Sequence, residues 1–191
     1  MPENDAHADQ NWLQQLQQSD EQALAALMNK YYSALKSYGI RFTQDEALVK
    51  DCIQEVFISL WQRRDNITTV LSLKYYLLRA VKNKVLKSLH QKIHKTAIAE
   101  WQEKYDFFQE FSVERLIIEK QVSEEKAIAL RKTLSQLSPR QHEVIYLKFY
   151  QRLDHGQIAD LMNISRQSVY NLLHEALQKL RGLWQAEYLT K

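Results

Sequence analysis

The fold is decided by residues 154–181, which read DHGQIADLMNISRQSVYNLLHEALQKLR. Apolar residues recur at spacings of three and four from Asp154 to Met162 and again after Ser165, which is typical of two helices. Asn163 stands between them, where its tolerance of left-handed backbone makes it a workable substitute for glycine. Ser165 is a favoured cap for the second helix. The stretch therefore predicts a helix-turn-helix.

The outer face of the second predicted helix suits DNA. In a helix-turn-helix this helix enters the major groove with its N-terminal residues leading. Arginine can donate to guanine, glutamine and asparagine can pair with adenine edges, and serine or tyrosine can hold phosphate. Two helices joined by a tight turn also occur in plain bundles, and that alternative stays open. The outward positions are Arg166, Gln167, Ser168, Tyr170, Asn171 and His174.

Composition restricts the class of protein. Only 3 Gly and 2 Pro occur among 191 residues, so the chain lacks the turn residues of a sheet protein with many hairpins. An all-α fold is expected. Cys52 is the only cysteine, which excludes an internal disulfide and a cysteine-based zinc site, and its helical spacing places it in the core. No charged and apolar leader opens the chain and no apolar run approaches about 18 residues, so a cytoplasmic location is expected.

Charge alternates in blocks along the chain, although the formal net charge is only +3. Residues 1–65 carry 10 acidic and 6 basic side chains, and residues 66–99 carry 7 basic and no acidic ones. Residues 100–125 carry 8 acidic and 3 basic side chains, and residues 126–191 carry 5 acidic and 10 basic ones. Two basic blocks separated by an acidic one suit a protein that places two faces on phosphate. Ordinary solvated helices are the alternative.

Two amphipathic helices are predicted near the N-terminus. The first ten residues have no apolar period, so no regular structure is expected there. Ser19 or Asp20 is expected to cap a helix that ends near Gly39, a residue typical of helix C-termini. A second helix is expected over about residues 43–61. Its acidic face consists of Asp51, Gln54 and Glu55.

A third predicted helix is basic on its outer side. Aromatic rings beside cations suit stacking on unpaired bases, and Tyr75 and Tyr76 stand among these charges. The apolar period predicts that Tyr76 is more buried than Tyr75, and the open alternative is that both belong to the core. The predicted inward residues are Leu73, Tyr76, Leu77, Ala80, Val81 and Val85. The predicted outward residues are Lys74, Arg79, Lys82, Lys84 and Lys87.

The whole pattern predicts two small helical domains joined by a linker, with the helix-turn-helix in the C-terminal one. We expect the domains at residues 1–91 and 124–191, and the linker at residues 92–123. In the second domain, Ser138 and Pro139 are expected to start a helix that continues through Phe149.

Three kinds of catalytic site are set aside. Asp51 and Glu55 lie one helical turn apart, but an exposed acidic face is more often solvated or a protein-docking surface than a metal site. His90 and His94 have the same spacing, but they stand among lysines that would repel a cation. The sequence has no visible nucleophile motif or phosphate loop. We therefore expect no catalytic residue, metal, cofactor or small-molecule substrate.

Four blocks of this sequence resemble, in order, the sigma factors of bacterial RNA polymerase, and specifically their compact extracytoplasmic-function group. DCIQEVFISLWQRRDNI (51–67) looks like the family's polymerase-binding helix. SLKYYLLRAVKNKVLKSL (72–89) looks like its promoter-melting and minus 10 segment. LSPRQHEVIYLKFY (137–150), followed by the helix-turn-helix, looks like its minus 35 domain.

The resemblance implies a protein that binds core RNA polymerase and promoter DNA and is itself no enzyme. Asp51, Gln54 and Glu55 would contact the coiled-coil clamp of the polymerase, and the loop from Asn66 to Ser72 would receive a flipped minus 10 base. An anti-sigma partner is also expected from the family. The minus 10 contacts would include Asn66, Lys74, Tyr75, Arg79, Lys82 and Asn83. The minus 35 contacts would be Arg166, Gln167, Ser168, Tyr170, Asn171 and His174.

Four positions depart from the family pattern. Met162 and Asn163 stand where leucine and glycine are frequent, and the turn is expected to survive. Leu172 occupies a position that is frequently histidine, and Glu175 one that is frequently basic. These differences bear on the promoter sequence more than on the function.

Two other functions remain alternatives. A stand-alone helix-turn-helix regulator would bind an operator tightly without polymerase. An interaction module with basic faces for acidic protein or RNA would show a salt dependence without promoter selectivity.

Overall fold

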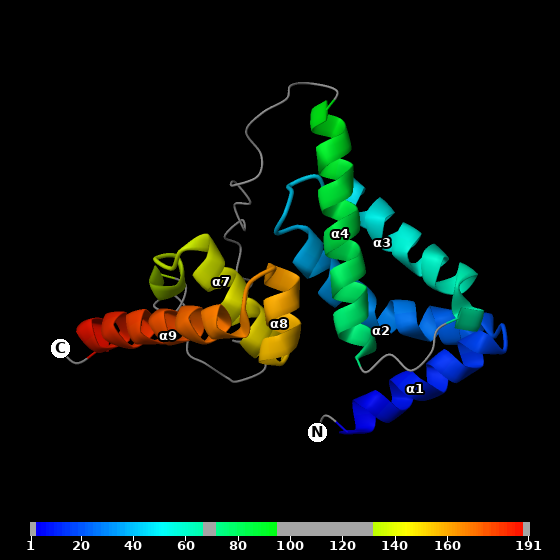
Figure 1. Ribbon diagram of the computed structural model, residues 1–191, viewed down its shortest axis with the longest axis horizontal. Coiled ribbons are helices and arrows are strands. Elements are labelled where there is room, and N and C mark those ends of the chain that lie inside the picture. Colours follow the sequence, from blue (N-terminus) through cyan, green and yellow to red (C-terminus); the bar gives the residue numbers. More distant parts are fainter. Residues whose placement is uncertain (1–2, 67–71, 95–131, 189–191) are drawn as a thin grey trace. The chain divides into compact units, whose positions relative to one another are not determined.

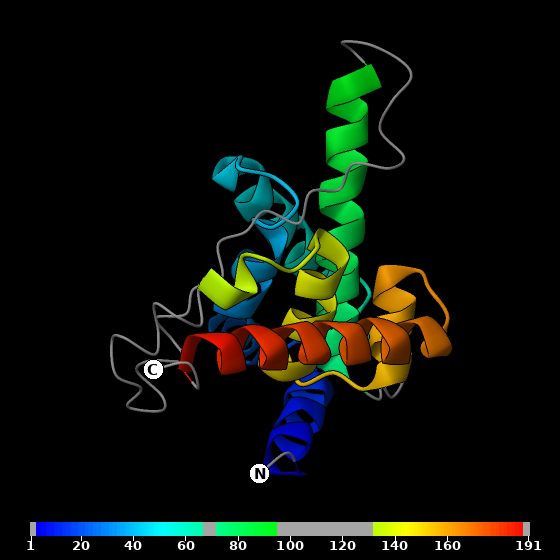
Figure 2. The same ribbon diagram turned by 90° about the vertical axis from the view of Figure 1, so that its left-hand side faces the viewer.

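The computed structural model describes residues 3–66, 72–94 and 132–188, and within these ranges every element is helical (Figures 1 and 2). The all-α expectation is confirmed. The chain divides into two compact units, Met1–Lys104 and Tyr105–Lys191. The expected linker at 92–123 lies outside the described residues, except for its first three residues in α4. No described helix combines the length and the apolarity of a membrane span.

The elements of the first unit are α1 (Glu3–Gln17), α2 (Glu21–Gly39), α3 (Glu46–Gln62), the short 3₁₀-helix η1 (Arg64–Asn66) and α4 (Leu73–His94). Those of the second unit are α7 (Pro139–Ile145), the π-helical turn η2 (Tyr146–Tyr150), α8 (His155–Met162) and α9 (Arg166–Tyr188).

The core of the first unit lies between α2, α3 and α4, which pack on one another. Asp20 caps α2 by accepting a hydrogen bond from Gln22 N at 2.8 Å. Asp45 caps α3 by accepting from Leu48 N at 3.0 Å, so α3 begins at Glu46 and later than predicted. The buried side chains of this core include Leu27, Leu35, Tyr38, Cys52, Ile53, Phe57, Leu60, Leu77, Leu78, Val81 and Val85.

Gly39 ends α2 as predicted, but for a different physical reason. No described glycine has a positive φ, so a left-handed cap does not require this one. A Cβ at Gly39 would instead lie 2.6 Å from Cγ1 of Val49 on α3. The glycine therefore permits a close approach of α2 and α3.

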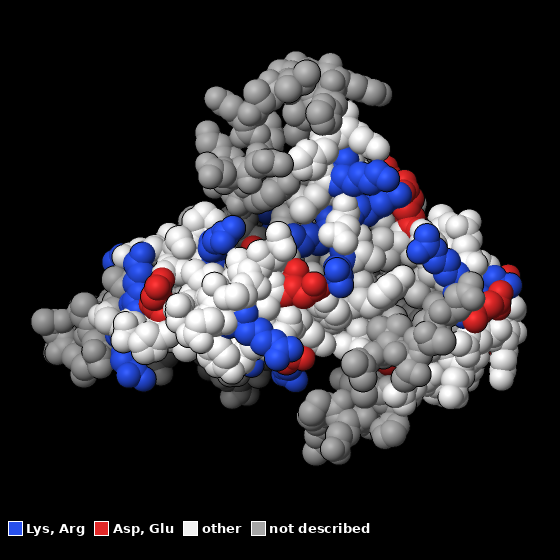
Figure 3. Space-filling view, viewed as in Figure 1, with Lys and Arg blue, Asp and Glu red and all other residues white. Residues whose placement is uncertain are grey.

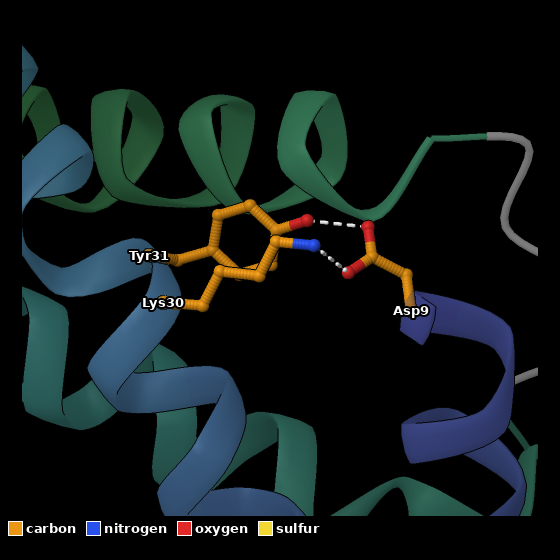
Figure 4. A network of polar contacts seen from close by, with 3 residues as sticks. All are labelled: Asp9, Lys30 and Tyr31. Atoms are coloured by element: carbon orange, nitrogen blue, oxygen red, sulfur yellow. Dashed lines mark hydrogen bonds and ion pairs between the residues drawn. The ribbon is translucent and has the colours of Figure 1, made fainter. Parts of the chain in front are cut away.

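The expectation of no regular structure in the first ten residues is wrong, because α1 begins at Glu3. Figure 4 shows the contact that fixes this helix to α2, in which Asp9 accepts from Lys30 Nζ at 2.8 Å and from the hydroxyl of Tyr31. Leu13 and Leu16 add buried apolar contacts. The apolar anchors follow the tenth residue, so the stretch before them carries no period of its own.

In the second unit, α9 packs against both α7 and α8 (Figures 1 and 2). Ser138 caps α7 in a reciprocal capping box with Gln141, and Pro139 is the first helical residue, as predicted. The α-helix ends at Ile145 and the chain continues as η2, in which Phe149 is 57 % exposed. Buried Leu134, Leu137, Val144, Leu147, Ile158, Leu161, Val169, Leu173 and Ala176 form the core.

Candidate nucleic-acid interface

The turn between α8 and α9 has the predicted geometry. Asp154 caps α8 by accepting from Gly156 N at 2.7 Å and from Gln157 N at 2.9 Å. Asn163 has φ 52° and ψ 50°, the left-handed conformation that glycine or asparagine adopts at a helix end. Ser165 Oγ accepts from Ser168 N at 3.0 Å, so α9 starts with a satisfied cap.

The first turns of α9 expose a polar face. Arg166, Gln167, Tyr170, Asn171 and His174 are exposed, while the apolar side chains on the opposite face are buried. The side chain of Ser168 is half-buried, and its hydroxyl lies 2.9 Å from Ser165 Oγ. Ser168 therefore takes part in the cap at the start of α9 and lies beside the exposed polar side chains of this face.

The two carboxamides on this face contact each other. Gln167 Nε2 donates to Asn171 Oδ1 at 3.1 Å, one helical turn apart. This bond uses one donor and one acceptor and leaves the carbonyl of Gln167 and the amino group of Asn171 for other partners. The pair presents an acceptor beside a donor, which is the pattern that an adenine edge complements.

The start of α8 lies against two of these α9 side chains. The rings of His155 and Tyr170 have centroids 4.3 Å apart and are tilted by 49°. A Cβ at Gly156 would lie 3.0 Å from Nη2 and 3.3 Å from Nε of Arg166. The sequence reasoning missed His155, because nothing in the linear pattern marks a contact across the turn.

The basic face of α4 carries the second group of predicted DNA contacts. Arg79 Nη1 donates to the hydroxyl of Tyr75 at 3.4 Å, and Lys82 Nζ lies 5.4 Å from the centre of the Phe42 ring. Lys74 is half-buried and Asn83 is exposed. Figure 3 shows basic side chains gathered over α4 with acidic ones directly beside them. Five of the six predicted minus 10 residues therefore lie on α4, and Asn66 lies in η1.

The prediction that Tyr76 is more buried than Tyr75 is wrong. Tyr76 is 37 % exposed, whereas Tyr75 is half-buried and its N–H donates to Ser72 Oγ at 3.3 Å at the start of the helix. The inward position expected for Tyr76 is taken by Leu78, which is fully buried. The side chains of α4 that are buried in its packing on α2 and α3 are Leu73, Leu77, Leu78, Val81 and Val85, which recur at helical spacing without Tyr76.

The loop that follows α3 is described only at its start. Arg64 donates to Trp61 O and to Ser19 Oγ, both at 3.0 Å, and its guanidinium lies 4.8 Å from the Trp61 ring centre. These contacts tie η1 to the turn between α1 and α2. Asn66 is the last residue of η1, and residues 67–71 of the predicted base-binding loop lie outside the described residues.

The acidic face of α3 is exposed, as Asp51, Gln54 and Glu55 all point away from the core. Glu55 forms an ion pair with Lys84 of α4. Ile58 lies one turn after Gln54 and Glu55 and is 54 % exposed, which makes it an apolar side chain within a polar face. Sequence reasoning missed Ile58, although its place off the apolar stripe is a signal.

No cation site is evident on these faces. Among the residues that the structure describes, no group of three or more His, Cys, Asp or Glu side chains is placed to hold a metal ion.

Comparison with known proteins assigns both units. Residues 27–92 match the family described as Sigma-70 region 2, and residues 127–180 match Sigma-70, region 4. The two matches comprise 66 and 54 residues, 120 of the 191 in the chain. No curated protein sequence is significantly similar.

Two solved structures share the fold at low identity. One is CnrH in complex with the cytosolic domain of CnrY, with 20 % identity, a TM-score of 0.56, and coverage of 94 % of this chain and 98 % of that one. The other is the sigma factor RpoE in complex with the anti-sigma factor NepR from Bartonella quintana. It has 15 % identity, a TM-score of 0.52, and coverage of 84 % of this chain and 96 % of that one.

Region 2 and region 4 thus follow each other with only residues 93–126 between the two matches, and the helices of each unit carry the faces described above. The chain belongs to the sigma-70 family of RNA polymerase sigma factors.

Proposed function

We propose that this sigma factor divides promoter recognition between its two units and binds core polymerase through α3. Asp51, Gln54 and Glu55 contact the coiled-coil clamp of the polymerase, with Ile58 as an apolar contact among them. The minus 10 element is bound by Asn66, Lys74, Tyr75, Arg79, Lys82 and Asn83. The minus 35 element is bound by Arg166, Gln167, Ser168, Tyr170, Asn171 and His174.

The observation that carries this proposal is the pairing of two exposed faces on one chain, each in the region where the family has its DNA contacts. The N-terminal turns of α9 are polar and exposed, as base readout in a major groove requires. On α4 an exposed arginine contacts a half-buried tyrosine, a combination suited to unpaired bases. A stand-alone regulator or a charge-driven interaction module is not favoured, because neither accounts for the region 2 match.

Promoter opening would use binding energy and no covalent step. Stacking on an aromatic side chain contributes about 1 to 3 kcal/mol per base, and extruding a base from a duplex costs a few kcal/mol. A unit that holds unstacked bases while basic side chains hold the strand can therefore offset melting without ATP. In this proposal the protein acts in the cytoplasm together with the polymerase and is not itself an enzyme.

An anti-sigma partner is part of the proposal. One structural neighbour is recorded with an anti-sigma factor and the other with a cytosolic domain of a second protein. The same fold in this chain supports a partner that covers its polymerase or DNA contacts until it is released.

The test is run-off transcription from a genomic fragment library by bacterial core polymerase, with and without this protein. We expect new discrete start sites that share two spaced motifs. The Arg166→Ala variant should relax the preference at one position of the upstream motif while leaving the start sites in place. A uniform loss across all upstream sequences would instead make Arg166 a phosphate contact.

Two results would contradict the proposal. Tight, selective operator binding by the free protein without core binding would establish the stand-alone regulator. Binding that falls with salt but has no sequence preference, alone or with polymerase, would establish the interaction module.

A further inference from the structure

The start of α8 is shaped to receive side chains of α9. His155 is the first residue of α8, and its ring lies 4.3 Å, centroid to centroid, from the ring of Tyr170. Tyr170 is 53 % exposed, so its ring has protein contact on one side and solvent on the other. A ring contact of this kind restricts the rotamers of an otherwise free surface tyrosine.

Gly156 makes room for a second side chain of α9. Glycine is unfavourable inside a helix compared with alanine, and Gly156 has no positive φ that would require it. A Cβ here would lie 3.0 Å from Nη2 of Arg166 and 3.1 Å from Oδ1 of Asp154. The absent side chain leaves a space that is bordered by the Arg166 guanidinium on α9 and by Oδ1 of Asp154, the residue that caps α8.

We infer that His155 and Gly156 are positioning residues for minus 35 recognition. They act through Tyr170 and Arg166, and neither has to touch DNA. The inference rests on the proposed function, since it assumes that the exposed face of α9 reads the minus 35 element. Side chains that are already held near one conformation lose less freedom on binding, so selectivity depends on what lies beneath them as well as on their own chemistry.

The His155 part is tested in a double-mutant cycle with Tyr170. Holoenzyme made from each variant is offered a library of promoters in which the upstream element is randomised, and selectivity is measured as the ratio of transcription from the preferred and the substituted elements. Tyr170 can hold phosphate as well as contact a base, so total transcription from all elements is recorded beside the ratio. We expect His155→Ala to lower, by roughly threefold to tenfold, whichever of these two quantities Tyr170→Ala lowers. His155→Phe retains a ring and should keep most of the selectivity. In the Tyr170→Ala background, His155→Ala should add no further loss.

The Gly156 part has a matched control in the same unit. Gly156→Ala should shift Arg166 and lower selectivity at the base pair that Arg166→Ala affects, again roughly threefold to tenfold. Gly182→Ala, at a helical glycine with nothing within 4 Å of the added carbon, should leave selectivity unchanged. Circular dichroism melting should show that Gly156→Ala stays folded, because a flexible arginine can move aside and alanine favours the helix.

Each outcome separates the inference from the function on which it rests. If Tyr170→Ala and Arg166→Ala both leave selectivity unchanged, the proposed minus 35 contacts are wrong and the inference falls with them. If those variants lose selectivity but His155→Ala and Gly156→Ala do not, the contacts stand and the positioning is refuted. An equal loss from His155→Ala with or without Tyr170 would also refute it, since His155 would then act independently.

Discussion

Gly39 and Val49 show how a single residue fixes the distance between two helices. Val49 is fully buried, and its Cγ1 lies where a side chain at position 39 would have to go, at 2.6 Å. No rotamer of the added methyl group can relieve this contact. The helices α2 and α3 must separate or Val49 must move, and either change disturbs a close-packed core.

Gly39→Ala is therefore expected to lower the free energy of unfolding by about 1 to 3 kcal/mol, as overpacking does in a dense core. Urea denaturation measures it. Gly182→Ala is the control, since it gains helix propensity in open space and should stabilise by ~0.5 to 1 kcal/mol. Adding Val49→Ala to Gly39→Ala should recover part of the loss, and strictly additive losses would argue against the contact.

Cys52 belongs to the core as a small apolar side chain. It is 2 % exposed, and its Sγ lies 3.7 Å from Ser88 Oγ. Burial raises the pKa of the thiol above its ordinary value of 9.0, because the thiolate would lose its solvation.

The native protein should consequently resist alkylation by iodoacetamide at mildly alkaline pH, while the protein in urea reacts freely. The pKa of Cys52 is higher in the folded than in the unfolded protein. The neutral thiol therefore contributes fully to folding stability below the unfolded pKa of 9.0, and this contribution is lost as pH rises through the folded pKa. Mass spectrometry of the alkylated chain measures the rates. Equal rates with and without urea would show that the site opens readily.

At the scale of elements, the connections are set by caps and turns of a few residues. The α8–α9 turn relies on the left-handed conformation of Asn163, and α2 and α3 are joined by a short segment whose flanking helices also share an ion pair. Each of these devices can be removed by one substitution on the surface.

Asn163→Gly should be neutral or slightly stabilising, because glycine adopts φ 52° without strain. Asn163→Val should cost about 1 to 3 kcal/mol, since a β-branched residue is strained in this region. Thermal melting compares the two variants. Similar melting temperatures would mean that the turn relaxes to another conformation.

The ion pair between Lys36 of α2 and Glu46 of α3 has N and O atoms 2.8 Å apart. The hydrogen bond from Lys36 lowers the pKa of Glu46 and raises that of Lys36. Because the pKa of Glu46 is lower in the folded protein, the ionised carboxylate contributes to folding stability above the unfolded pKa of 4.5. This contribution is lost as pH falls through the folded pKa. Urea midpoints of Glu46→Gln and the parent chain should differ slightly at neutral pH and converge in acid. A difference between the two urea midpoints that grows in acid would contradict a lowered pKa for Glu46.

At the scale of the whole molecule, α3 and α4 connect the two proposed functions of the first unit. Glu55 on α3, the helix proposed to bind polymerase, forms an ion pair with Lys84 on α4, the helix proposed to bind DNA. Exposed pairs of this kind contribute about 0 to 1 kcal/mol, so a polymerase can replace the partner of Glu55 at little cost.

Changing Asp51 and Glu55 together to alanine should weaken core polymerase binding by on the order of 1 kcal/mol or more without unfolding the chain. Ile58→Ala should add to this loss. Glu21→Ala removes an exposed carboxylate from α2 and serves as the control. Competition for core polymerase against a labelled parent chain measures the affinity of all three variants. Unchanged affinity of the double variant would remove α3 from the proposed interface.

The sequence by itself determined the following features, each of which depends on neighbours within a few residues. They are the helical period, the caps at Ser138 and Ser165, the left-handed Asn163, and the blocks that match the two sigma regions. Short-range hydrogen bonds and periodic burial are written in local order, so they can be read without coordinates.

The tertiary structure alone decided features that need partners from distant parts of the chain. Asp9 anchors α1 by accepting hydrogen bonds from Lys30 and Tyr31 of α2. The orientation of α4 exposes Tyr76, and Val49 of α3 requires the glycine at position 39. The contact of His155 with Tyr170 likewise joins two helices across a turn. Such contacts depend on how helices approach and rotate against one another, which their separate periods do not specify.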